Sequence, residues 1–124
     1  VMQLAAARGK LLEQLAEREH GPREFTEMAF ITGMLSLMDV LLGMPLPEIL
    51  AEISVPIAVR AALLRREGRL GLMLALAEQL ETDDRVAVRE SLARIEGTIP
   101  IAAGDLMPMQ IAAYRWANEI AGTK

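Results

Sequence analysis

The sequence predicts an all-α protein, a compact bundle of about six or seven short to medium helices. Residues that favour helix dominate it, chiefly Ala, Leu, Met, Glu, Arg and Gln, and no run alternates β-branched with polar residues. Proline and glycine divide the chain into helical segments. With 124 residues, of which 52% are hydrophobic, the chain is expected to form one domain, 1–124, without an internal boundary.

The first predicted helix runs from Met2 to Glu19, and Gly21-Pro22 ends it. Its apolar stripe is formed by Leu4, Leu11, Leu12 and Leu15. The second predicted helix runs from Pro22 to Leu42. From residue 28 to residue 44 it is almost wholly apolar, which is typical of a buried central helix and is short for a membrane span.

Small residues mark two features of this second helix. Gly33 and Ser36 would let another helix approach closely, and Gly43 is a suitable residue to follow the helix end. Asp39 is the only charge between residues 28 and 44, so we expect it to be at least partly buried.

The middle of the chain is predicted to form three helices. A short helix spans Pro47 to Ile53, and Ser54-Val55-Pro56 introduces another that continues to Arg66. Glu67-Gly68 breaks the chain before a helix that ends near Glu81.

The last third is predicted to form two helices. Thr82-Asp83-Asp84 offers capping oxygens to a helix from Arg85 to Glu96. The stretch from Thr98 to Gly104 is irregular in pattern, and Asp105 is expected to cap a final helix that extends through Ile120.

Composition excludes several function classes. The formal net charge is −4, whereas a general nucleic-acid binder tends to be basic, so no nucleic-acid partner is expected. The chain has no cysteine and one histidine, His20, which we interpret as a solvated residue at a helix end. Because a catalytic metal needs several converging His, Asp or Glu side chains, we expect no metal, no other cofactor and no catalytic residue.

Arg8 and Asp39 are predicted to form a structural ion pair. A buried carboxylate must be paired or hydrogen-bonded, and Arg8 lies on the first helix between small residues. The alternative is that Asp39 contacts a ligand or partner. If the pair forms, Asp39→Asn would cost about 1–3 kcal/mol of stability.

The most basic stretch contains Arg60, Arg65, Arg66 and Arg69. No aromatic residue is interleaved with these arginines, so they lack the stacking partners that nucleic acids need. We interpret them as a solvated face, with a docking surface for an acidic partner as the alternative.

Two of the four aromatic residues lie within one helical turn, at Tyr114 and Trp116. Positions two apart do not share a helix face. We therefore expect Trp116 to anchor the last helix by packing inward, and Tyr114 to lie at an edge or interface.

Five segments of the chain are similar to short sequence patterns of one protein family. The segment Ala29–Asp39 is similar to the pattern Phe-x-x-Gly-Leu-Leu-Ser-x-x-Asp, and Leu42–Pro45 to Leu-Gly-Met-Pro. Ala62–Gly71 is similar to Ala-Leu-Leu-x-x-Glu-Gly-x-Leu-Gly. Ala6–Ala16 resembles Arg-Ala-x-x-x-Glu-x-Leu-Ala, with Gly9 where the family tends to have Ala, and Tyr114–Ala117 resembles Ala-x-x-Trp-Ala. Taken in chain order, these five segments resemble the HDOD signalling family, most closely those HDOD segments that follow EAL-type domains in cyclic di-GMP signalling proteins.

The resemblance implies a non-catalytic, regulatory module of a bacterial signalling protein. Its partner would be another protein or an attached EAL-type domain, and a homodimer is a further candidate assembly. The chain would be the C-terminal part of an HDOD domain, and a start at Val1 already in helical pattern agrees with a piece of a longer, cytoplasmic protein. The alternatives are a divergent HD-type metal-dependent phosphohydrolase and a nucleic-acid adaptor.

Overall fold

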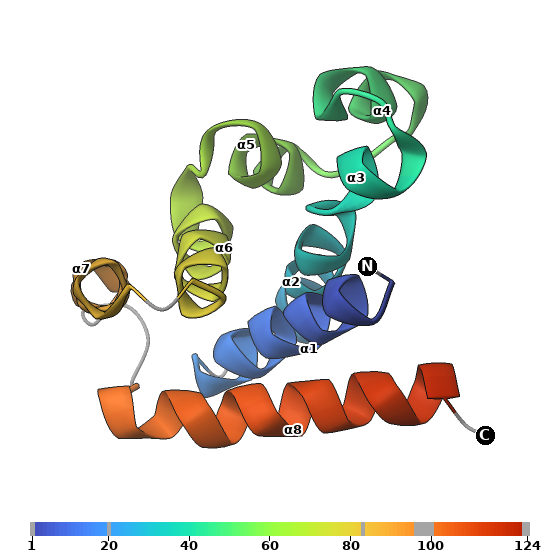
Figure 1. Cartoon of the computed structure of the whole chain (residues 1–124). Helices are drawn as coiled ribbons and strands as arrows, with labels where there is room; N and C mark the ends of the chain where they lie inside the picture. Colours follow the sequence, from blue (N-terminus) through green and yellow to red (C-terminus); the bar gives the residue numbers. More distant parts are fainter. Residues whose placement is uncertain (1, 20, 83, 96–100, 123–124) are drawn as a thin grey trace.

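A computed structural model of the chain describes residues 2–19, 21–82, 84–95 and 101–122 (Figure 1). These residues contain eight helices and no strand, which confirms the all-α prediction. The helices are α1 (Met2–Arg18), α2 (Arg23–Leu35), α3 (Met38–Leu42), α4 (Leu46–Glu52), α5 (Ile57–Arg65), α6 (Gly68–Leu80), α7 (Arg85–Ile95) and α8 (Ala103–Gly122).

Helix α1 lies at the centre of the bundle, in contact with α2, α6 and α8. The long helix α8 runs along one side of the molecule, α7 lies outside α6, and α3 and α4 lie far from α8 (Figure 1). The main core is built from large aliphatic side chains that are fully buried. These are Leu12, Leu15, Leu50, Val59, Met73, Leu74, Leu76 and Ile95.

Helices α1 and α2 touch backbone to backbone at a pair of glycines. A Cβ atom added to Gly33 would lie 2.5 Å from the Cα atom of Gly9, and one added to Gly9 would lie 2.8 Å from the carbonyl oxygen of Phe30. Both distances are far below van der Waals contact, so any larger residue would force the helices apart. The predicted close approach at Gly33 is confirmed, and the departure from the HDOD pattern at Gly9 has a steric reason.

The single helix predicted from Pro22 to Leu42 is wrong, because the chain breaks after α2 and restarts as α3. At the break, the Ser36 hydroxyl donates to the carbonyl oxygen of Gly33 at 2.7 Å, a local bond that competes with regular helix. The expectation of a buried central helix fails for α3, since Val40 is 61% exposed and no residue of α3 is buried. Gly43 ends α3 with a φ of 69°, as predicted.

The predicted N-terminal cap is confirmed for α7, whereas α8 begins earlier than predicted. Asp84 caps α7 as expected, because its Oδ1 accepts from the backbone N–H of Ala87 at 3.1 Å. Helix α8 begins at Ala103, two residues before the predicted cap. Asp105 is therefore the third residue of α8, and its Oδ2 accepts from the N–H of Ala102 at 2.9 Å, which is half of a capping box.

Candidate functional site

Arg8 is the buried centre of a polar cluster that joins α1, α2 and α6. Its Nε and Nη2 atoms donate to the two carboxylate oxygens of Glu81, at 2.9 and 2.5 Å. Its Nη1 donates to the Ser36 hydroxyl at 2.8 Å. This two-pronged geometry is the strongest way in which an arginine binds a carboxylate, and it satisfies a side chain that is only 6% exposed.

A second arginine clamp continues the cluster toward α5. Arg66 donates through Nε and Nη2 to Glu78, at 2.8 and 2.6 Å, and Glu78 also lies 3.8 Å from Nη1 of Arg8. Arg66 follows α5 in the left-handed region, with a φ of 55°, and its Nη1 donates to the carbonyl oxygen of Leu63 at 2.5 Å. The cluster therefore fixes α5 and α6 relative to α1.

The cluster is closed to ligands. The cavity beside Arg8, Glu81, Gln110 and Tyr114 has a volume of about 10 Å³, which is room for one water molecule at most. Tyr114 borders this cavity from α8. Burial raises the pKa of its phenol, the Glu81 carboxylate raises it further, and the Arg8 guanidinium acts in the opposite sense.

The predicted pair between Arg8 and Asp39 is wrong. Arg8 does make a long-range ion pair, but its nearest carboxylate belongs to Glu81, the residue that follows α6. Asp39 is half-buried in the first turn of α3, where its Oδ1 accepts from the neighbouring N–H of Val40 at 2.8 Å. Arg8 pairs with Glu81 and not with Asp39 because its side chain faces the end of α6. This contact joins distant parts of the chain, so no local sequence pattern encodes it.

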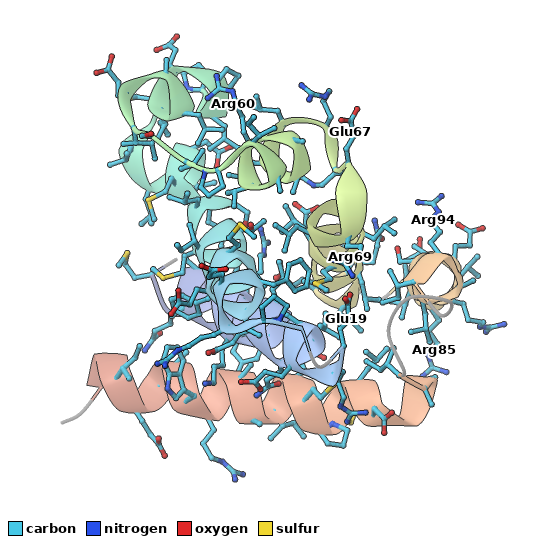
Figure 2. All side chains as sticks on the ribbon, turned by 180° about the vertical axis from the view of Figure 1, so that it is seen from behind. Glu19, Arg60, Glu67, Arg69, Arg85 and Arg94 are labelled. Carbon is cyan, nitrogen blue, oxygen red and sulfur yellow. The ribbon has the colours of Figure 1, made fainter. Side chains whose placement is uncertain are left out.

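The four arginines singled out from the sequence do not form an open basic face. Arg60 donates to the carbonyl oxygen of Leu50 at 3.2 Å, and Arg65 pairs with Glu67 at 3.1 Å. Arg66 binds Glu78 in the polar cluster around Arg8. Arg69 donates to Glu19 at 2.7 Å, a contact seen in Figure 2, and its guanidinium lies 4.8 Å from the centre of the Phe25 ring. Their use as a docking surface stays a prediction, with most of their charge already paired.

Trp116 packs against α1 and α2, where the sequence places an anchor. Its half-buried ring meets Phe30 edge-to-face, with 5.7 Å between ring centres, and Nζ of Lys10 lies 5.1 Å from its ring centre. The same side chain covers Ala6, Ala7 and Ala117. How much Trp116 contributes to stability stays a prediction.

A row of exposed apolar side chains on α8 was not predicted from the sequence. Met107, Ile111 and Tyr114 form a row on the outer face of α8 and are 68%, 51% and 37% exposed. Their spacing of four and three residues was a visible signal, because it places all three on one helix face. We call this row the α8 outer face.

A groove between α7 and α8 continues the α8 outer face. It has a volume of about 420 Å³, and Met107 and Gln110 line both the groove and the outer face. Leu80, Val88 and Leu106 contribute apolar side chains to it, and Arg85 and Arg89 contribute guanidinium groups. Figure 2 shows Arg85 on the side of α7 nearest α8 and Arg94 on the opposite side.

The structure also bears on whether the chain has groups that could bind a metal or a helix that could span a membrane. Across residues 2–19, 21–82, 84–95 and 101–122, no three His, Cys, Asp or Glu side chains converge as metal ligands would. Within the same ranges, no helix is long and apolar enough to cross a membrane. His20 lies outside the described residues.

Comparison with known proteins gives one distant relative. Over 117 residues the chain is 28% identical to the cyclic di-GMP phosphodiesterase CdgJ of Vibrio cholerae. No protein-family model matches the chain, and no solved structure matches it. The match covers 94% of this chain but 26% of CdgJ, so the chain spans about a quarter of its relative's length.

Proposed function

We propose that the chain is a non-catalytic, HDOD-like regulatory module of a cyclic di-GMP signalling protein. The observation that carries the proposal is the sequence match to CdgJ. This match covers nearly the whole chain, and CdgJ is named a cyclic di-GMP phosphodiesterase. The ordered HDOD-like segments and the all-α fold agree with it. The module would act by contacting an attached EAL-type domain or another protein.

The distribution of charge and apolar surface supports a contact role. The cluster around Arg8 is internal and closed, so it serves to hold helices in place. The α8 outer face, in contrast, exposes an ordered row of apolar side chains, which is typical of interaction surfaces. A helical bundle that presents such a face can transmit a contact to an attached domain.

A catalytic module is the second candidate, because the relative is itself called a phosphodiesterase. Incubating the purified chain with cyclic di-GMP and Mg²⁺ or Mn²⁺, and measuring the linear dinucleotide product by chromatography, tests it directly. We expect no product above the protein-free control. Metal-dependent turnover by the chain alone would overturn the non-catalytic assignment.

The regulatory role is tested in the relative. The segment of CdgJ that matches this chain is deleted in one variant and replaced by this chain in another, and cyclic di-GMP hydrolysis is measured for both. Allosteric coupling is typically about 5–150-fold, so we expect deletion to change the rate by at least about fivefold and replacement to restore it in part. A rate that deletion leaves unchanged would refute a regulatory role for this segment.

A further inference from the structure

Arg85 and Arg89 differ from three arginines that lie between helices, Arg8, Arg66 and Arg69. Each of those three binds a carboxylate. No described acidic side chain forms an ion pair with Arg85 or Arg89, although both line the groove between α7 and α8. Two exposed cations at the edge of an apolar groove are therefore available to an acidic partner.

The spacing of these cations suits a helix. Arg85 and Arg89 are one turn apart on α7, which places their Cβ atoms about 6 Å from each other. Carboxylates one turn apart on a second helix have the same separation, so two ion pairs can form at once. Asp84, the one acid among the described residues that line the groove, already accepts the capping bond from Ala87.

The apolar part of the surface has the same helical period. Met107 joins the groove to the α8 outer face, and Ile111 and Tyr114 extend the row along α8. Recognition of a helix in a groove uses anchors at this spacing, with apolar side chains in the centre and charges at the side. At the far end the row is flanked by one basic and one acidic residue, Arg115 and Glu119.

We propose that the groove and the α8 outer face together bind an acidic amphipathic helix, with its apolar stripe on Met107 and Ile111 and its carboxylates on Arg85 and Arg89. This deepens the proposed function, because it names the kind of partner that the module contacts. A second copy of the chain fits less well. Pairing two α8 outer faces would leave the arginines of α7 without carboxylates.

The test uses two designed peptides of about 18 residues, long enough for several helical turns. Both have blocked ends and leucines at helical spacing; one has glutamates beside this stripe and the other has lysines. Fluorescence anisotropy measures the binding of each labelled peptide to the full chain. We expect the glutamate peptide to bind with a Kd of about 1–100 μM and to bind more weakly at about 0.5 M salt. The lysine peptide should bind at least about tenfold more weakly than the glutamate peptide.

Matched variants locate the site. Arg85→Glu combined with Arg89→Glu should weaken glutamate-peptide binding by at least about tenfold and should favour the lysine peptide, since both charges are reversed. Arg94→Glu is the control, because Arg94 is exposed on the opposite side of the same helix and should alter binding by less than about twofold. Circular dichroism confirms that each variant keeps the helical content of the wild type.

Three results would overturn this proposal. Equal binding of the two peptides would show general apolar adhesion, and equal loss in the Arg94→Glu variant would show a diffuse charge effect. No binding, together with a dimer that Ile111→Glu abolishes in sedimentation experiments, would assign the surface to a second copy. Peptide binding is read without any phosphodiesterase, so its failure leaves the regulatory role to be decided by the deletion and replacement in CdgJ.

Discussion

Replacing Glu81 by glutamine is expected to lower the free energy of unfolding by about 2–3 kcal/mol. Glutamine keeps the shape of the side chain but removes the charge that compensates the Arg8 guanidinium. Breaking a fully buried ion pair costs about 3–5 kcal/mol, because the remaining charge stays buried without its partner. Here the Glu81 side chain is 21% exposed and Glu78 lies 3.8 Å from Arg8, so part of that cost is avoided.

Urea denaturation followed by circular dichroism measures the effect. The midpoint should fall while the slope with denaturant stays the same, because the folded and unfolded surfaces hardly change. In a thermal melt, 2–3 kcal/mol corresponds to a fall of about 10 °C for a domain of this size. The matched control is Asp39→Asn, for which we expect a change below about 0.5 kcal/mol, in place of the larger cost that an ion pair with Arg8 would give.

Two outcomes would refute this reasoning. A loss below about 0.5 kcal/mol for Glu81→Gln would mean that solvent compensates Arg8 without the carboxylate. An equal loss for Asp39→Asn would restore Asp39 as a partner of Arg8. A further check replaces the pair together, with Arg8→Met and Glu81→Leu, which should recover much of the stability lost by Glu81→Gln.

Three further predictions address packing and ionisation. Gly33→Ala should destabilise the chain by about 1–3 kcal/mol or more in urea denaturation, because its Cβ would meet backbone atoms, whereas Gly104→Ala, with open space around it, should be neutral or slightly stabilising. Tyr114 should titrate above 10.0 in ultraviolet absorbance, and Glu81→Gln should lower that pKa. Since the folded pKa is the higher one, the stability linked to Tyr114 is present below pH 10 and is lost as pH rises through the folded value. The hydrogen bond from the N–H at residue 102 lowers the pKa of Asp105 below 3.8, so the melting temperatures of the wild type and Asp105→Asn should converge as pH falls through that lowered value.

Local patterns in the sequence were sufficient for the fold class and for several helix ends. Asp84 and Gly43 act within one turn of the backbone that they cap or terminate, so their roles follow from neighbouring residues. The break between α2 and α3 was missed because Ser36 was interpreted only as a small residue within an otherwise apolar run, from residue 28 to residue 44. It depends on Ser36, whose hydroxyl binds both its own helix and Arg8 from α1.

The candidate site was harder to predict because its contacts join distant parts of the chain. Arg8 and Glu81 are 73 residues apart, and their meeting depends on how α6 crosses α1. The α8 outer face could be predicted in part from the local sequence. Its row of Met107, Ile111 and Tyr114 is periodic in the sequence, but only the packed structure shows that these side chains stay exposed beside the groove between α7 and α8.

The shallow placement of α3 has a consequence for the order in which the chain opens. With none of its residues buried, α3 can unfold while α1, α2 and α6 stay packed, so its amide protons should exchange with solvent through local opening. Amides near Leu12 and Leu74, whose side chains are fully buried, should exchange only when the whole bundle unfolds. Hydrogen exchange would then separate a slowly exchanging foldon around α1 from a fast-exchanging α3 within the same bundle.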